Sequence, residues 1–292
     1  MLDSAVFWGM GCAILWGCSN FCARFAGRAV GAVAATLAMM VVGGVLIAAI
    51  IGATGEPLVL RLDGVHWLLG IGAGVAFGSL LFYQAVTHGP LSLATPVVAS
   101  YPAIAVPVSV ILGAQAGPIT WAAMAITMVG VWLVVRVVSN SGAGATRTEY
   151  APAVVRQTIF YALAAATIYA VSLSAAARAL EIYGPLQTVF AVRIIGVAIV
   201  GMFMLLRRVK MRFPPRAWPI LVSFGLLDTS GHVMIFVGMR LEHGEYTIVT
   251  SVGYTVVTVL LARIFLREPV SARQWGSIAL VVAGVAILAT FG

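Results

Sequence analysis

Charge is what this chain has least of. Only 9% of its 292 residues are Asp, Glu, Lys or Arg, whereas 62% are hydrophobic. A soluble globular domain carries about 25% charged residues, so the deficit excludes a soluble enzyme or binding domain. The composition predicts an all-α integral membrane protein, because a helix satisfies its own backbone groups inside a bilayer.

Motifs that hold nucleotides, metals or a catalytic nucleophile are also missing. No Gly-rich loop is followed by Lys–Ser/Thr, and no loop is long enough for a nucleotide-binding domain, which argues against an ATP-driven pump. The only cysteines, Cys12, Cys18 and Cys22, share one apolar run without a ligand set, so we interpret them as packing residues. We expect no cofactor, no metal and no enzymatic activity.

The few charges that are present are mostly basic, and the net charge is +8. The excess is arginine in short loops, which is typical of a cytoplasmic membrane face rather than of nucleic-acid binding, so we expect no nucleic-acid partner. If both termini face outside, thirteen basic residues are cytoplasmic and three (Arg61, Arg178 and Arg240) are not. The thirteen are Arg24, Arg28, Arg136, Arg147, Arg156, Arg207, Arg208, Lys210, Arg212, Arg216, Arg263, Arg267 and Arg273. We therefore predict a multi-pass protein of the cell inner (plasma) membrane with the 207–216 loop in the cytoplasm.

Long apolar runs are abundant. A bilayer-spanning helix needs about 20 apolar residues, and ten stretches meet this description. They cover residues 5–25, 32–52, 67–86, 93–112, 121–138, 158–179, 185–206, 218–239, 247–265 and 275–289.

The second half of the chain repeats the first. Residues 153 apart match at Phe7 and Phe160, Ser19 and Ser172, Gly31 and Gly184, Gly43 and Gly196, and Tyr101 and Tyr254. Five spans per copy is an odd number, so the second copy must be inverted, as in many secondary transporters. We predict ten transmembrane helices in two inverted five-helix repeats, residues 1–138 and 157–292, joined by a connecting loop at 139–156. A duplicated scaffold that moves nothing is the alternative.

The fourth span contains three prolines, Pro96, Pro102 and Pro107. Proline removes a backbone donor and bends a helix, so we predict a bend near Pro96 or Pro102 that exposes Ser100 or Tyr101 to a central cavity. A kinked packing helix is the alternative. The equivalent span, 247–265, has no proline, so the two halves are expected to differ in local shape.

Three ionisable residues lie well inside the spans: Arg193, Asp228 and His232. Such residues are costly in a membrane and usually functional. Asp228 and His232 are four apart and share one helix face, and Arg193 lies at a depth where it could meet Asp228. Snorkelling of Arg193 to the interface, and a hydrogen-bonded core histidine instead of a proton relay at His232, are the alternatives.

Aromatic and hydroxyl residues at mid-depth complete a predicted substrate site. Trp16 and Tyr169, like Tyr101 and Tyr254, occupy equivalent positions of the repeat, where an inverted-repeat carrier would line its cavity. The predicted substrate-binding residues are Trp16, Asn20, Tyr83, Thr95, Ser100, Tyr101, Tyr169, Arg193, Asp228, His232, Ser251 and Tyr254.

Two segments resemble the drug/metabolite transporter superfamily, EamA type. They are AILWGCSNF at 13–21 and LREPVSARQWGSIALVVAGVAIL at 266–288. The second contains Glu268 and Gln274 in the spacing of the Gly-Glu-x-x-x-x-x-Gln-x-x-Gly pattern, with Arg267 where glycine is usual. Gly276 stands one residue before the position of the last glycine of the pattern. The first copy of this pattern is weaker, and Gln115 stands where glutamate is usual.

The resemblance implies a ten-helix carrier, similar to the YddG-like amino-acid exporters, whose termini would be cytoplasmic; the arginines predict the reverse. The expected function is a secondary transporter that exports amino acids and related small metabolites through a central cavity by alternating access. Its partners would be a small-molecule substrate and membrane lipid, and either a monomer or a homodimer is compatible with the sequence. Multidrug or cationic-compound efflux is the alternative, although the first span lacks the membrane-embedded acid of small relatives. A channel and an intramembrane enzyme built on Asp228 and His232 are further alternatives.

Overall fold

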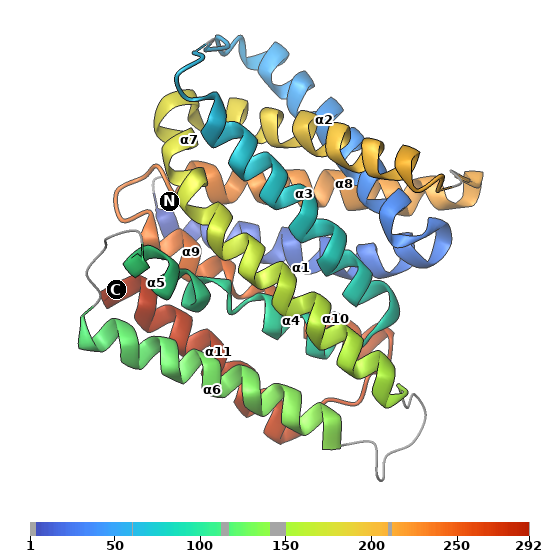
Figure 1. The fold of residues 1–292 in the computed structure, drawn as a ribbon, viewed down its shortest axis with the longest axis vertical. Helices are drawn as coiled ribbons and strands as arrows, with labels where there is room; N and C mark the ends of the chain where they lie inside the picture. The colour runs from blue at the N-terminus through green and yellow to red at the C-terminus, as the bar shows by residue number, and fades with distance from the viewer. Residues whose placement is uncertain (1–3, 60, 112–116, 141–149, 210–211, 292) are drawn as a thin grey trace.

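The computed structural model describes residues 4–59, 61–111, 117–140, 150–209 and 212–291, and every regular element among them is helical (Figure 1). Gln115 and most of the predicted connecting loop, residues 141–149, lie outside the described residues. The elements are α1 (Ala5–Val30), α2 (Ala32–Thr54), α3 (Val65–His88), α4 (Leu91–Val98), α5 (Tyr101–Ile111), α6 (Pro118–Asn140), α7 (Pro152–Leu206), η2 (Pro215–Ala217), α8 (Trp218–Gly238), α9 (Glu245–Ser251), α10 (Tyr254–Phe265) and α11 (Ala272–Phe291).

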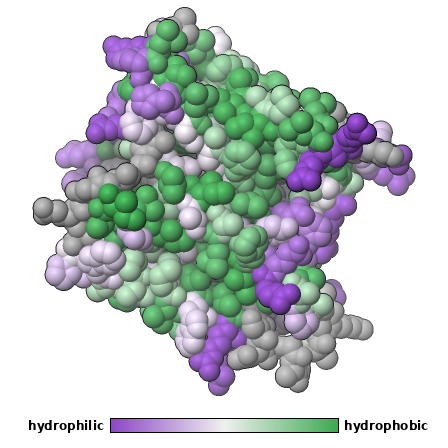
Figure 2. All heavy atoms as spheres, viewed as in Figure 1, coloured by the Kyte–Doolittle hydropathy of each residue, from purple (hydrophilic) through white to green (hydrophobic). Residues whose placement is uncertain are grey.

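The helices have the length and surface of membrane spans. Among the described residues, eight helical segments are long and apolar enough to cross a bilayer, and the apolar helices Tyr254–Phe265 and Ala272–Leu288 are shorter. Hydrophobic side chains cover most of the face in Figure 2, and hydrophilic ones gather toward its left and right edges. Apolar residues such as Ile14, Trp132 and Phe160 are more than half exposed, which suits contact with lipid. The chain is a multi-pass membrane protein.

The duplication has a structural signature at two glycines. Gly31 separates α1 from α2 with φ +88°, and Gly184 kinks α7 with φ +74°. Glycine adopts positive φ without the steric cost of a Cβ atom. The two glycines are 153 residues apart, so the single long helix α7 contains the two spans predicted at 158–179 and 185–206.

The proline-rich span is broken where the sequence predicts a bend, between α4 and α5 at residues 99–100. The expectation that the equivalent span of the second copy would differ in local shape is wrong. Residues 252–253 separate α9 from α10 at the position equivalent to 99–100. The backbone N–H of Gly253 bonds to the carbonyl of Thr250, three residues earlier, and Ser251 Oγ bonds to the carbonyl of Ile248. Hydroxyls that bond back to the helix bend it, so a serine and a glycine make this break without proline.

The two copies exchange roles in the packing. Helix α1 contacts α8, α9 and α10, whereas α7 contacts α3, α4 and α5. A shift of 153 residues converts α1 into the first half of α7, and α3, α4 and α5 into α8, α9 and α10. Helices α6 and α11, which are equivalent, lie side by side (Figure 1). These exchanges are the mark of a pseudo-two-fold relation between repeats.

A buried carboxylate fixes the start of α4. Glu268 is 4% exposed and accepts hydrogen bonds from the backbone N–H groups of Leu91 (3.2 Å) and Ser92 (3.1 Å). Gln274 Nε2 donates to the carbonyl of Ser92 at 3.0 Å. The first N–H groups of a helix have no partner in the helix and carry positive partial charge, so this carboxylate caps α4. Arg267 has φ +54°, which gives the physical reason for glycine at that position in the resembling pattern.

Arg24 completes this cluster and corrects one sequence-based assignment. The sequence counted it among loop arginines, but it lies inside α1, is 3% exposed and pairs with Glu268 at 3.3 Å. Its Nη1 also donates to the carbonyl of Gly89 at 2.6 Å, and its Nη2 donates to the hydroxyl of Tyr150. We call Arg24, Glu268 and the α4 start the polar clamp, since it ties α1, α3, α4 and the α10–α11 connection together.

We predict that Glu268→Gln destabilises the protein, because it leaves the Arg24 guanidinium buried without a counter-charge. Removal of one partner of a buried pair costs about 3 kcal/mol or more, and Arg24→Met combined with Glu268→Gln should recover part of this loss. Thermal unfolding in detergent micelles measures the effect.

The matched control is Glu181→Gln, because the Arg178–Glu181 pair is 2.9 Å long but more than 60% exposed on both sides. Exposed pairs contribute little, so this variant should unfold like the wild type. Equal unfolding temperatures for Glu268→Gln and Glu181→Gln would contradict the role assigned to the polar clamp.

Candidate functional site: a central cavity between the two halves

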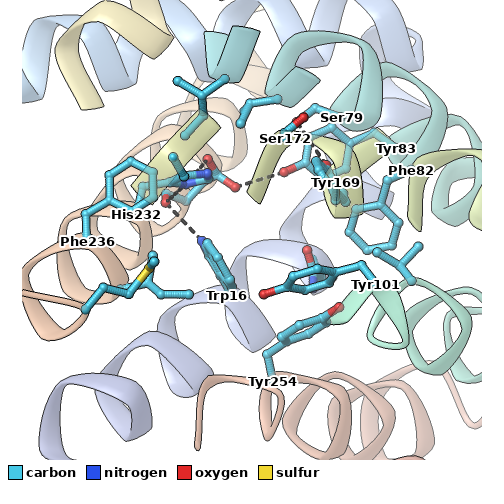
Figure 3. Close-up of a pocket in the computed structure, with 18 residues that line it drawn as sticks. Trp16, Ser79, Phe82, Tyr83, Tyr101, Tyr169, Ser172, His232, Phe236 and Tyr254 are labelled. Carbon is cyan, nitrogen blue, oxygen red and sulfur yellow. Dashed lines mark hydrogen bonds and ion pairs between the residues drawn. The ribbon is translucent and has the colours of Figure 1, made fainter. Parts of the chain in front are cut away.

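A cavity of about 120 Å³ lies where the two copies meet. Its wall comes from α1, α3 and α4–α5 of the first copy and from α7, α8 and α10 of the second (Figure 3). Eight of the predicted site residues line it: Trp16, Asn20, Tyr83, Tyr101, Tyr169, Asp228, His232 and Tyr254. The sequence reasoning did not identify Ile71, Val75, Ser79, Phe82, Val98, Ser172, Ala176, Ile235, Phe236 and Met239, which complete the wall.

The charged residue of the wall, Asp228, forms an ion pair with Arg193. Arg193 Nη2 lies 2.8 Å from Asp228 Oδ2, and the Tyr83 hydroxyl donates to Asp228 Oδ1 at 2.9 Å. Arg193 is fully buried, which excludes snorkelling to the interface. Its Nη1 faces the sulfur atoms of Met39 and Met40 at 3.3 and 3.4 Å. Among the cavity-lining residues Arg193 is absent, so it stands behind the carboxylate and orients it.

His232 joins this pair through one ring nitrogen. Its Nδ1 lies 3.0 Å from Arg193 Nη2, 2.9 Å from the carbonyl oxygen of Asp228 and 3.3 Å from Asp228 Oδ2. If Nδ1 accepts from the guanidinium, Nε2 carries the ring hydrogen; if Nδ1 donates to Asp228, Nε2 is an acceptor. The tautomer of the imidazole is therefore coupled to the ion pair.

Two large rings reach the cavity because glycine faces each of them. A Cβ atom on Gly231 of α8 would lie 2.4 Å from Trp16 of α1, and one on Gly78 of α3 would lie 2.5 Å from Tyr169 of α7. The two glycines, like the two rings, are 153 residues apart. Trp16 Nε1 also donates to the carbonyl of Asp228 at 3.3 Å. The close approach fixes both rings at equivalent places in the wall.

Two further rings stand at the helix breaks. Tyr101 begins α5 and Tyr254 begins α10, so each break turns a tyrosine into the cavity (Figure 3). The centroid of Tyr254 lies 6.0 Å from that of Trp16, and the centroid of Tyr101 lies 6.4 Å from that of Tyr169. Four rings from four elements therefore surround the same space, and we call Trp16, Tyr101, Tyr169 and Tyr254 the ring cage.

The two copies line the cavity from equivalent positions but with different chemistry. A shift of 153 residues places Val75 at the position of Asp228 and Ser79 at that of His232, and these four residues all line the cavity. The same shift relates Tyr83 to Phe236. The sequence alone could have identified Val75, Ser79 and Phe236, because each lies 153 residues from a predicted site residue. The first copy supplies the less polar pole and the second copy the charged pole.

Three predicted residues, Thr95, Ser100 and Ser251, are not part of the described cavity wall. Their hydroxyls bond to carbonyls of their own helices, those of Leu91, Val97 and Ile248. The prediction that Tyr101 or Ser100 faces the cavity is thus met by Tyr101 and not by Ser100. Hydroxyls that are bonded inside a helix help to shape the breaks instead.

Comparisons with known proteins agree with this architecture. No curated protein matches the chain. A solved structure described only as "Crystal structure of protein" has a TM-score of 0.69 and 21% sequence identity, and covers 97% of this chain and 95% of its own; at this identity it supports the fold alone. The model of the EamA-like transporter family matches twice, at residues 3–136 and 156–290. These matches cover nearly the whole chain, which belongs to the EamA-like transporter family.

Proposed function

We propose that this member of the family is a secondary transporter for small amphipathic metabolites that carry an ammonium group, with amino acids as the first class to test. The observation that carries the proposal is the central cavity, which both copies build around the buried Arg193–Asp228 pair. Charged groups at membrane depth persist when they serve a substrate or ion path. The proposed substrate contacts are the ring cage, Asn20, Tyr83, Asp228 and His232, with Arg193 as a positioning residue.

The proposal includes ten membrane crossings in two inverted repeats, divided at the 139–156 connection. Alternating access requires a cavity that is closed at one end. Along α1 the polar clamp lies one turn beyond the cavity, since Arg24 follows Asn20 by four residues. At the other end the wall reaches Met239, directly after α8. We propose that the polar clamp closes the cavity toward the arginine-rich face, and that transport requires this clamp to open.

We predict saturable counterflow of neutral amino acids in proteoliposomes, with and without a pH gradient. A substrate trapped inside should accelerate uptake of the labelled substrate, because a carrier exchanges one bound molecule for another. Trp16→Leu removes a cage ring and should reduce uptake, whereas Phe160→Leu changes a ring that is 66% exposed on the outer surface and should not. Flux that neither saturates nor responds to internal substrate would identify a channel and contradict the proposal.

We predict that the 207–216 loop is cytoplasmic and that the α2–α3 connection faces outside. In a background without Cys12, Cys18 and Cys22, Asp63→Cys should react with an impermeant thiol reagent in intact cells. Arg212→Cys should react only after permeabilisation. Both positions are exposed, so accessibility is matched, and the reverse labelling pattern would place the termini in the cytoplasm.

We predict that Asp228→Asn lowers the yield of folded protein, because the buried Arg193 loses its counter-charge. Removal of one partner of a buried pair costs about 3–5 kcal/mol. Adding Arg193→Met should restore part of the yield without restoring transport. Size-exclusion chromatography gives the yield, and Asp63→Asn, on an exposed connection, is the control. Wild-type yield and wild-type uptake in Asp228→Asn would contradict both the structural and the transport role.

A further inference from the structure

We infer that the central cavity recognises its substrate by the ammonium group alone and has no site for a carboxylate, so that primary amines are better ligands than the corresponding acids. The inference rests on the proposed function and names the substrate chemistry of that same cavity. It departs from amino acids as the best ligands, since an amino acid carries both groups. Three independent features of the wall lead to it.

The first feature is the order of charges. Asp228 lines the cavity, whereas Arg193 is fully buried behind it. Proteins bind carboxylates with arginine forks, which donate two parallel hydrogen bonds. One terminal nitrogen of Arg193 faces the sulfurs of Met39 and Met40, and the other already bonds Asp228 and His232. The Nε of Arg193 has no hydrogen-bond partner among the described residues but is buried with the rest of the side chain. Since Arg193 does not line the cavity, a substrate there meets the carboxylate end of the ion pair.

The carboxylate keeps room for one more donor. Asp228 receives the hydroxyl of Tyr83 and the guanidinium of Arg193, and His232 Nδ1 lies within 3.3 Å of Oδ2. An ionised carboxylate has about four lone-pair sites. An ammonium group can take the remaining site, or the one that His232 occupies. The same carboxylate repels a second carboxylate.

The second feature is the ring cage. The negative π-faces of Trp and Tyr attract cations within about 6 Å of the ring centroid. Trp16 lies 5.0 Å from His232 between centroids, and so borders the charged pole directly. The arginine–ring contacts among the described residues involve Tyr150, Trp132 and Phe203, none of which lines the cavity. The cage rings are therefore not occupied by the protein's own arginines.

The third feature is the asymmetry between the copies. The positions equivalent to Asp228 and His232 are Val75 and Ser79, which are not ionisable. A molecule with one cationic end and one apolar end fits this gradient, with its ammonium toward α8 and its apolar end toward α3. A zwitterion must place its carboxylate near Asp228 or against uncharged wall groups, because none of the described lining residues is an arginine or a lysine. The cavity is thus polarised for a single positive charge.

Four probes of one shape separate these contributions: phenethylamine, L-phenylalanine, 3-phenylpropanoate and 3-phenylpropanol. Each carries one ring, in keeping with a cavity near the size of about 150 Å³ that accommodates benzene. Calorimetric titration of the purified protein at neutral pH, and inhibition of counterflow, give the affinities. We expect the amine to bind at least tenfold more tightly than the acid and several-fold more tightly than the alcohol.

The ring cage has its own variants. Tyr254→Leu should weaken amine binding roughly 5- to 30-fold, and it should weaken alcohol binding less. Tyr254→Phe keeps a ring and should lose less than Tyr254→Leu, and Phe160→Leu on the outer surface should bind like the wild type. The comparison of the four probes needs only the wild-type protein, so it decides the inference even if Tyr254→Leu fails to fold.

Each outcome bears on one proposal or on both. An acid that binds as tightly as the amine, or an alcohol equal to the amine, overturns the ammonium inference and leaves the transporter proposal standing. Uptake of L-phenylalanine with no inhibition by phenethylamine does the same. If none of the four probes binds and no amino acid undergoes counterflow, the cavity is not a substrate site for this chemistry, and both proposals fail.

Discussion

Two charges that lie in the middle of an apolar molecule constrain the arrangement around them. Arg193 comes from the second half of α7 and Asp228 from α8, and they meet at 2.8 Å beside α2. Because an unpaired charge at this depth is so costly, the two helices cannot separate or rotate without a penalty. The pair also aligns Tyr83 and His232, so the same interaction that secures the packing places the polar groups of the cavity.

The duplicated sequence explains why the two halves share their helix kinks and breaks although the charged residues of the cavity come from one half. The kinks at Gly31 and Gly184, the helix breaks at 99–100 and 252–253, and the glycines under Trp16 and Tyr169 all recur after 153 residues. These backbone features occur in both copies, whereas the ionic residues at the cavity, Arg193 and Asp228, belong to the second copy alone. Arg193 even contacts Met40, which is its own counterpart in the repeat. The repeated backbone therefore supports a cavity wall whose side chains differ between the two copies.

Among other places, helix α1 contacts the second copy at the polar clamp and at the Arg193–Asp228 ion pair. Arg24 near the end of this helix meets Glu268, while Trp16 two turns earlier borders Asp228. Both contacts link α1 to the second copy, one near the end of the helix and one at the central cavity. Since a helix is stiff over such a distance, movement of α1 at the polar clamp would move Trp16 at the cavity. In the proposed transport cycle, opening of the polar clamp would therefore also change the shape of the cavity.

The sequence alone determined the membrane class, the all-helical fold, the duplication and the three ionisable residues inside the spans, because hydropathy, repeat spacing and charge are properties of residues in order. It also located one helix break through its prolines. Tertiary structure decided which faces turn inward. Helical periodicity gives the depth of Thr95, Ser100 and Ser251 but not their rotation toward a cavity, and these hydroxyls bond to their own helices. Whether Arg193 snorkels or pairs, and whether Arg24 is a loop charge or a buried one, depended on partners far away in the chain. Such pairings depend on the packing of distant helices, which local sequence cannot specify.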